Sequence, residues 1–311
     1  MSQVPQTRSR KKQDFEMKKI SIAVTSIAPL INLDHYNNFP RIISQIWKKI
    51  SPDDYSKFEK KCRENNLILS TDGFLRKIST IEKRTGINNI ISKEVRSINA
   101  IQNKSANVLK KQQEKVETII NNSDSLNESN KKELIKLVHS ATNTRYGISN
   151  ENIGVKLFNQ FSDDKIINQQ DSQKIAFFKD DINGYIFEFT GRCDGITKNK
   201  KIVEIKNRQS KLFNEVRDYE MCQIQTYLHS TGYESAYLVE VLPGSNISNS
   251  EFGIIEVVKN NDYYDSMIKP YISKIVKFLM KLKNNEFDDK FKLALISGDS
   301  DKLCYKTYLN L

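Results

Sequence analysis

The spacing of apolar residues divides the chain into a helical first part and a second part in which strands alternate with helices. In residues 40–121 apolar side chains recur three or four positions apart, as at Ile42, Ile46 and Ile50, which is the period of amphipathic helices. Residues 91–120 carry few apolar side chains among many Lys, Gln and Asn, so we expect one long solvated or DNA-facing helix there. Residues 1–16 are polar and basic and predict a disordered tail.

Beyond residue 174 the two-residue period of strands takes over. Residues 174–180 and 184–190 predict a hairpin, because the Asn-Gly pair at 183–184 favours a tight turn. Further apolar strands are expected at 202–206, 236–241 and 252–258, and helices at 213–230 and 263–282. We therefore expect an α/β core in which helices flank a central mixed sheet.

Three charged side chains stand out within these strands. Asp194 follows the strand that ends near residue 190, and Glu204 and Lys206 lie in an apolar run. Side chains two apart on a strand share a face, so Glu204 and Lys206 point the same way. If the two strands pair as a hairpin, Asp194 comes close to Glu204. Two carboxylates and an ammonium would then be half-buried together, where charge is costly.

Such a cluster has both a functional and a plain structural interpretation. Two carboxylates that face each other suit a hard cation such as Mg²⁺ or Mn²⁺, which binds phosphate oxygens and acidifies a water molecule. An adjacent lysine would hold that water or offset charge on the phosphate. Asp, Glu and Lys are common residues, however, and from this pattern alone a surface hairpin with an ordinary Glu–Lys pair is the simpler interpretation.

Motifs elsewhere in the chain change that balance. The chain resembles the PD-(D/E)xK nuclease superfamily, and within it the lambda exonuclease and YqaJ-like branch, over roughly residues 139–258. The resemblance rests on Asp194 with Glu204-Ile205-Lys206, on Arg145-Tyr146-Gly147-Ile148-Ser149-Asn150-Glu151, and on Met221-Cys222-Gln223-Ile224-Gln225-Thr226-Tyr227. The chain departs from the family pattern at Cys193, where the motif has proline.

The resemblance implies a restriction-endonuclease-like core and a set of site residues. It assigns the metal to Asp194, Glu204, the Ile205 carbonyl and Glu151, and it assigns catalytic roles to Glu151, Asp194, Glu204, Lys206 and Gln223. By sequence alone Glu151 is no more than a surface acid, which we place in the first turn of a helix capped by Ser149 or Asn150. Tyr227, four residues after Gln223, is expected to pack in the core.

Several residues are candidates for contacts with DNA phosphates. Thr25 and Ser26 precede an apolar Ile-Ala-Pro segment, a pattern that starts a helix, and the family uses a similar turn to hold a 5′-phosphate. A plain helix cap is the commoner meaning of this pattern. The remaining phosphate candidates are Arg145, Arg208 and Lys211.

Composition supports a polyanionic partner and excludes several classes. The net charge is +11, from 49 Lys and Arg against 38 Asp and Glu, which favours nucleic acid or an anionic surface. Four dispersed cysteines, at positions 62, 193, 222 and 304, provide no framework for an iron–sulfur cluster. The sequence has no ATP-binding Walker loop, no paired histidines, no apolar run long enough for a membrane span and no signal peptide.

We therefore expect a Mg²⁺-dependent deoxyribonuclease, with Mn²⁺ as a substitute, that needs neither ATP nor an iron–sulfur cluster. The expected divisions are a basic tail at 1–16, a helical region at 17–138 and the nuclease core at 139–311. The resemblance implies 5′→3′ exonuclease action on duplex DNA ends during viral recombination, repair or genome processing, inside the cell, in cytoplasm or nucleus. An endonuclease of the same superfamily and a non-catalytic DNA-binding scaffold are the alternatives, and a single-strand annealing protein and further copies of the chain are candidate partners.

Overall fold

The computed structural model describes residues 18–33, 39–65, 67–102, 105–169, 172–180 and 185–298. The expected tail at 1–16, the turn at 181–184 and Cys304 lie outside the described residues. The first part is helical, as predicted, and contains α1 (Ile27–Leu30), α2 (Phe39–Ile50), α3 (Pro52–Glu64), α4 (Phe74–Thr85), α5 (Ile90–Ala100) and α6 (Ala106–Asn121). It begins with a strand, β1 (Lys18–Ala23), and a short turn of 3₁₀ helix at Val24–Ser26.

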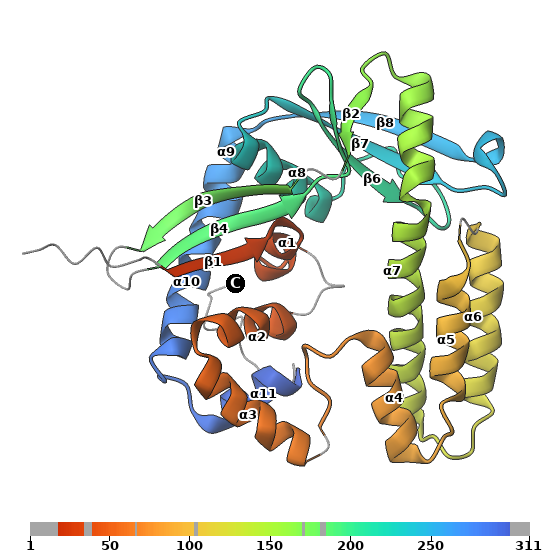
Figure 1. The fold of residues 1–311 in the computed structure, drawn as a ribbon, viewed down its shortest axis with the longest axis vertical. Coiled ribbons are helices and arrows are strands. Elements are labelled where there is room, and N and C mark those ends of the chain that lie inside the picture. Colours follow the sequence, from red (N-terminus) through yellow and green to blue (C-terminus); the bar gives the residue numbers. More distant parts are fainter. Residues whose placement is uncertain are drawn as a thin grey trace, which may run out of the picture.

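A single long helix, α7 (Glu128–Phe161), joins the helical part to the sheet (Figure 1). The side chain of Asn127 caps its first turn by accepting a hydrogen bond from the Asn130 amide at 2.9 Å. The first half of α7 packs with α4, α5 and α6 in one apolar cluster, and the second half packs on the sheet in another. The expected boundary at 138/139 falls inside this helix.

The strands form two sheets that the chain connects at Cys193 and Asp194. Sheet order is β1-β4-β3 in the smaller sheet and β2-β5-β6-β7-β8 in the larger. The strands are β2 (Ile166–Gln169), β3 (Ser172–Asp180), β4 (Tyr185–Arg192), β5 (Gly195–Thr197), β6 (Ile202–Asn207), β7 (Ser235–Leu242) and β8 (Glu251–Val258). Both sheets are mixed, because β1 runs parallel to β4 and β6 runs parallel to β7 while the other pairs are antiparallel.

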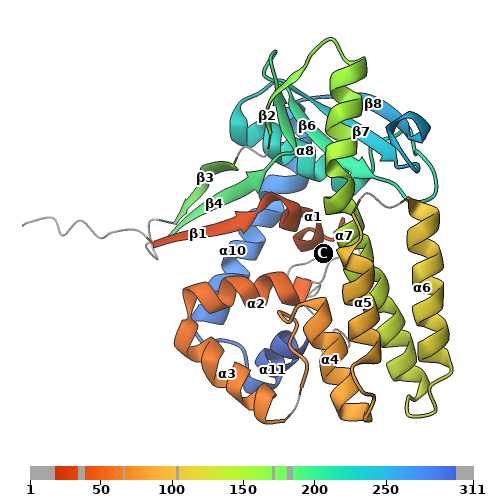
Figure 2. The same cartoon turned by 45° about the vertical axis from the view of Figure 1, so that its right-hand side comes forward.

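Helices cover both faces of the five-stranded sheet (Figures 1 and 2). Val203 and Ile205 of β6 pack against α7, whereas Ile202 belongs to the cluster that contains Ile224 and Leu228 of α8 (Asp218–Thr231). The closing elements are α9 (Asn261–Tyr263), a π-helical turn at Tyr264–Ile268, α10 (Lys269–Lys283) and α11 (Asp289–Ser297). This arrangement confirms the expected α/β class with a mixed sheet between helices and a helical region before it.

Three local expectations are wrong. The helix expected at 91–120 is divided into α5 and α6, with residues 101–105 between them. The strand before Asp194 does not pair with β6, because β4 lies in the other sheet and the three-residue β5 pairs with β6 instead. No helix starts at residues 149–150, because α7 continues through Gly147 to Phe161. Gly147 is not required by close packing, since a Cβ added there would meet no atom within 4 Å. The hairpin of β3 with β4 is confirmed.

Candidate active site

Asp194 and β6 form the centre of the candidate site. Asp194 is half-buried at the crossing between the two sheets, immediately before β5. Its Oδ2 accepts a hydrogen bond of 2.6 Å from the backbone amide of Ile205 on β6. The predicted closeness of Asp194 to this strand is therefore present, although β5, and not β4, provides the pairing that creates it.

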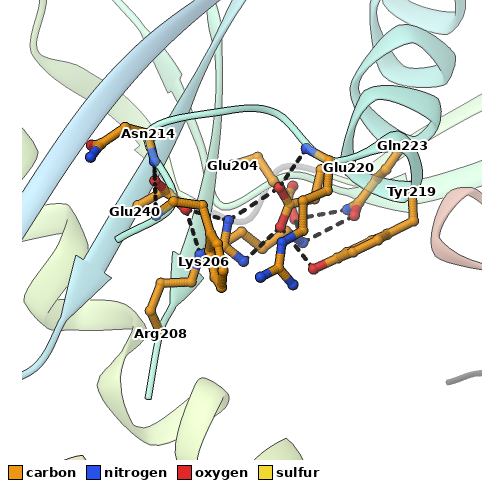
Figure 3. A network of polar contacts seen from close by, with 10 residues as sticks. Glu204, Lys206, Arg208, Asn214, Tyr219, Glu220, Gln223 and Glu240 are labelled. Carbon is orange, nitrogen blue, oxygen red and sulfur yellow. Dashed lines mark hydrogen bonds and ion pairs between the residues drawn. The ribbon is translucent and has the colours of Figure 1, made fainter. Parts of the chain in front are cut away.

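A second group joins β6 to α8 (Figure 3). It consists of Glu204 and Lys206, which share one face of β6, and Gln223 from α8. The Lys206 Nζ donates to Glu204 Oε1 at 2.8 Å and to Gln223 Oε1 at 3.0 Å, and the Gln223 Nε2 donates to Glu204 Oε1 at 2.7 Å. Both contacts with the Glu204 carboxylate are made to Oε1 and none to Oε2. Among the residues that the structure describes, no donor reaches Glu204 Oε2, although this oxygen is buried.

The site contains more carboxylates than cationic side chains, and this excess shifts the pKa values of its residues. Burial, followed by the charges of Glu204 and then Glu151, raises the pKa of Asp194 to about 8, although the Ile205 amide and Lys206 act in the opposite direction. Burial alone would lower the pKa of Lys206, but the Glu204 carboxylate, with Asp194 and Glu220, raises it above its ordinary value. Lys206 is therefore an ammonium ion in this structure.

Glu151 reaches this region from α7. It is half-buried, and its charge raises the pKa of Asp194, after burial and the charge of Glu204. Its position differs from the expected one, because it lies 23 residues into a 34-residue helix and not in a first turn. The dipole of a helix N-terminus therefore does not act on Glu151.

Arg208 does not have the place expected of a phosphate contact. Its side chain is buried between two carboxylates that are themselves fully buried (Figure 3). The Nη1 and Nη2 atoms donate to Glu220 on α8 at 2.7 and 3.1 Å, and Nε donates to Glu240 on β7 at 2.6 Å. Arg208 thus joins three elements around the site instead of facing solvent.

The sequence reasoning missed Glu220 and Glu240. Burial would raise the pKa of Glu220, but its hydrogen bonds to Arg208 lower it below the ordinary value. Oε2 of Glu240 accepts from the backbone amides of Phe213 and Asn214 at 3.0 and 2.7 Å, so it also fixes the loop between β6 and α8. A glutamate in an apolar strand run, as at position 240, was the available signal.

The other phosphate candidates lie in different surroundings. The turn at Val24–Ser26 packs beside β4 and α8, with Thr25 exposed and Ser26 half-buried. Ser26 makes no capping hydrogen bond, and α1 has only four residues, so little helix dipole is present there. Lys211 is exposed on the loop after β6, and Arg145 lines a groove between α7 and α4.

The ring of Tyr227 packs directly against the backbone of β4 at Gly191. Tyr227 is 2% exposed, which agrees with the expected core position. A Cβ added at Gly191 would lie 3.0 Å from Tyr227 Cζ and overlap the neighbouring ring carbon. Glycine at this position therefore lets the aromatic ring of α8 lie directly against β4, two residues before Cys193.

The donor set suits a hard divalent cation. In the described part of the chain no three His, Cys, Asp or Glu side chains are grouped closely enough to enclose an ion by themselves. Mg²⁺ does not require this, since proteins usually hold it through one or two carboxylates and leave the other positions to water and phosphate oxygens. Asp194, with its raised pKa, and the unpartnered Glu204 oxygen supply two such ligands. The residues present therefore fit the ion.

Comparisons with known proteins give limited similarities. No family model matches the chain, and no curated protein matches it. Among solved structures, an alkaline exonuclease from Laribacter hongkongensis gives a TM-score of 0.34 at 13% identity, over 53% of this chain and 87% of that one. Its complex with dAMP gives 0.35 at 13% identity, over 54% and 88%, and SSO0001 gives 0.35 at 19% identity, over 49% and 68%.

Likenesses with TM-scores this low do not establish an activity, so the functional proposal below rests on the geometry of the site. No helix in the described ranges has the length and apolar composition that a membrane span requires.

Proposed function

We propose that the protein is a metal-dependent nuclease that hydrolyses phosphodiester bonds in DNA. The observation that carries the proposal is the buried Glu204 oxygen without a donor beside Asp194, in a fold that keeps both carboxylates close to a lysine. A bound Mg²⁺ would be held by Asp194 and Glu204, with Glu151 at the edge and the Ile205 carbonyl as a further oxygen ligand. When bound, the ion supplies charge neutralisation and an acidified water.

The side chains of the chain itself have separate tasks in this reaction. Hydrolysis forms a bond between the water oxygen and phosphorus, and the bond from phosphorus to the departing sugar oxygen breaks. The Lys206 ammonium would offset the negative charge that develops on the phosphoryl oxygens. Gln223 holds both Lys206 and Glu204, so it fixes the direction of the ammonium. Asp194 must lose its proton before it binds a cation.

We further propose that the enzyme acts on duplex ends in the 5′→3′ direction. This proposal is supported by the position of the Thr25–Ser26 turn, which packs beside β4 and α8, the elements that flank Asp194 and carry Gln223. Two hydroxyl groups there would face the extra charge of a terminal 5′-phosphate, which an internal phosphodiester lacks.

The test compares linear duplex DNA with 5′-phosphates, the same duplex with 5′-hydroxyls, and closed circular DNA, each with Mg²⁺ and with excess EDTA. We expect rapid degradation only of the phosphorylated linear duplex with Mg²⁺. Glu204→Gln keeps the shape of the side chain and should lower the rate by about a hundredfold or more, the scale of a lost catalytic contact. Full activity in EDTA, or in Glu204→Gln, would refute the assigned site. Cleavage of closed circular DNA as fast as of linear DNA would leave the assigned metal site unchallenged and would favour an endonuclease over an exonuclease.

A further inference from the structure

A group of cations lies away from the Asp194 site, between the helical region and the first half of α7. A cavity of about 260 Å³ is enclosed there by α2, α4, α7 and the end of α11. Three cations line it: Arg41 from α2, Lys77 from α4 and Lys136 from α7. Among the described residues, none of these three forms an ion pair with a carboxylate.

Two carboxylates, Asp72 and Glu133, also line the cavity and neutralise this group only in part. Asp72 is engaged elsewhere, because Arg63 donates to both of its oxygens at 2.6 and 2.8 Å and Arg76 lies 3.5 Å away. Glu133 is exposed on the surface of α7. Burial, and then the charge of Arg41, lower the pKa of Lys77, with Lys136 acting in the same direction and Asp72 and Glu133 in the opposite one.

An apolar groove of about 300 Å³ continues from this cavity, and Phe74 lines both. Its walls come from the start of α4, from Asn99 on α5 and from α7. Phe74 and Leu75 on one wall face Ile148, which is 57% exposed, and Arg145 lines the groove beside it. Exposed apolar surface next to unpaired cations is the combination with which proteins hold nucleic-acid strands, through stacked bases and charged backbone contacts.

One face of α7 connects the cavity, the groove and the active site. That face carries Glu133, Leu137 and Ser140 in the cavity, Thr144 and Ile148 in the groove, and then Glu151, at spacings of three and four residues. At 1.5 Å per residue, Lys136 lies about 22 Å along the helix from Glu151. The helix α4 packs against the first half of α7, and the five-stranded sheet lies at the other end of that helix (Figure 1).

We propose that the cavity and the groove together form a track for a single nucleic-acid strand that continues from the Asp194 site along α7. Backbone phosphates would lie on Arg41, Lys77, Lys136 and Arg145, and bases would pack on Phe74 and Ile148. A strand fits better than a duplex, because spaces of 260 and 300 Å³ hold groups the size of a nucleotide. The inference rests on the proposed function, since it assigns the path of that enzyme's substrate.

The test uses salt dependence, because each lost phosphate contact lowers the slope of log affinity against log salt by about 0.7 for single strands. We expect Arg41→Gln, Lys77→Gln and Lys136→Gln together to make the slope shallower by about 2 for a labelled single strand of about twelve nucleotides in EDTA. The matched control neutralises three exposed lysines elsewhere, Lys60→Gln, Lys110→Gln and Lys269→Gln, and should change the slope much less. Because Lys77 is partly buried, a variant with only Arg41→Gln and Lys136→Gln, with an expected change of about 1.4 in the slope, serves if the triple variant does not fold.

A second readout tests the apolar wall. Ile148→Ala should weaken strand binding, whereas Ile167→Ala, which alters a side chain that is 62% exposed away from the groove, should not. Hydrolysis of a nitrophenyl ester of a single nucleotide, too short to reach the track, should stay at the wild-type rate in the cation variants. Equal slopes for the track and control variants would overturn the inference, as would equal loss in Ile148→Ala and Ile167→Ala. If the track variants change the slope as expected but the wild type hydrolyses no DNA, the proposed function fails and the track remains.

Discussion

The buried ion-pair network around Arg208 allows a prediction with a defined magnitude. Arg208 is 7% exposed, and its partners Glu220 and Glu240 are fully buried. Arg208→Met keeps the apolar volume of the side chain but leaves two carboxylates without their cation. Removal of one partner from a buried ion pair costs about 3–5 kcal/mol, because an uncompensated charge stays in the interior. We expect a loss of this size in the free energy of unfolding.

The assay is urea unfolding of wild type, Arg208→Met and a control, Lys201→Met. Lys201 forms a 2.6 Å ion pair with Glu256, but the two side chains are 24% and 46% exposed. The control should therefore cost at most about 1 kcal/mol. Neutralising both acids, with Glu220→Gln and Glu240→Gln added to Arg208→Met, should recover most of the lost stability.

The same variants separate stability from positioning. Glu240 holds the amides of Phe213 and Asn214, and Glu220 lies on the helix that carries Gln223. The stabilised triple variant should therefore remain folded but hydrolyse DNA more slowly, with a larger effect on kcat than on KM. A loss in Arg208→Met no greater than in Lys201→Met would refute this account of the network. The pKa of Glu220 is lower in the folded protein than in the unfolded chain, so its carboxylate stabilises the fold fully above the unfolded pKa, and this contribution is lost as the pH falls through the folded pKa.

Three further predictions concern the site itself. A raised pKa of about 8 keeps Asp194 protonated at neutral pH. The affinity for Mg²⁺ should therefore rise about tenfold per pH unit up to that value and level off above it. Calorimetry should show this rise, and Asp194→Asn should abolish it. Lys206→Ala should cut the hydrolysis rate by about a hundredfold while duplex binding persists in a chain of net charge +11, and unchanged turnover would exclude the lysine. Gly191→Ala should cost about 1–3 kcal/mol because its Cβ overlaps Tyr227, whereas Gly147→Ala meets no atom and should stabilise α7 slightly; equal melting temperatures would contradict this.

Local pattern was enough to find the face of β6 that carries the candidate site. Side chains alternate along any strand, so Glu204 and Lys206 had to share a face, and their hydrogen bond of 2.8 Å shows that they do. The helical spacing likewise placed Gln223 on a buried face of its helix, where it reaches both residues. The first relation depends only on the alternation of side chains within β6, and the second depends on the helical motif around Gln223 that follows β6 in the sequence.

Relations between distant residues could not be predicted in this way. The partners of Arg208 lie 12 and 32 residues further along the chain, so a basic loop beside the site was the natural interpretation of its sequence. A strand of three residues, such as β5, is too short to show a period, and its pairing with β6 replaced the expected hairpin. Ser149 and Asn150 suggested the start of a new helix, but α7 continues through Gly147 at a cost of only about 1 kcal/mol, which its packing on two apolar clusters exceeds.

In the proposed nuclease, the distribution of charge gives a reason for a cation to bind before DNA. Among the residues that the structure describes, four carboxylates, those of Asp194, Glu204, Glu220 and Glu240, contact or face two cations, Lys206 and Arg208, which leaves two negative charges if all ionise. The chain as a whole carries +11, so its surface attracts a polyanion while its centre repels one. A proton on Asp194 relieves part of that repulsion in the absence of metal. A divalent cation relieves more of it and can at the same time bind the phosphate, which makes occupation of the site by metal and by substrate mutually favourable.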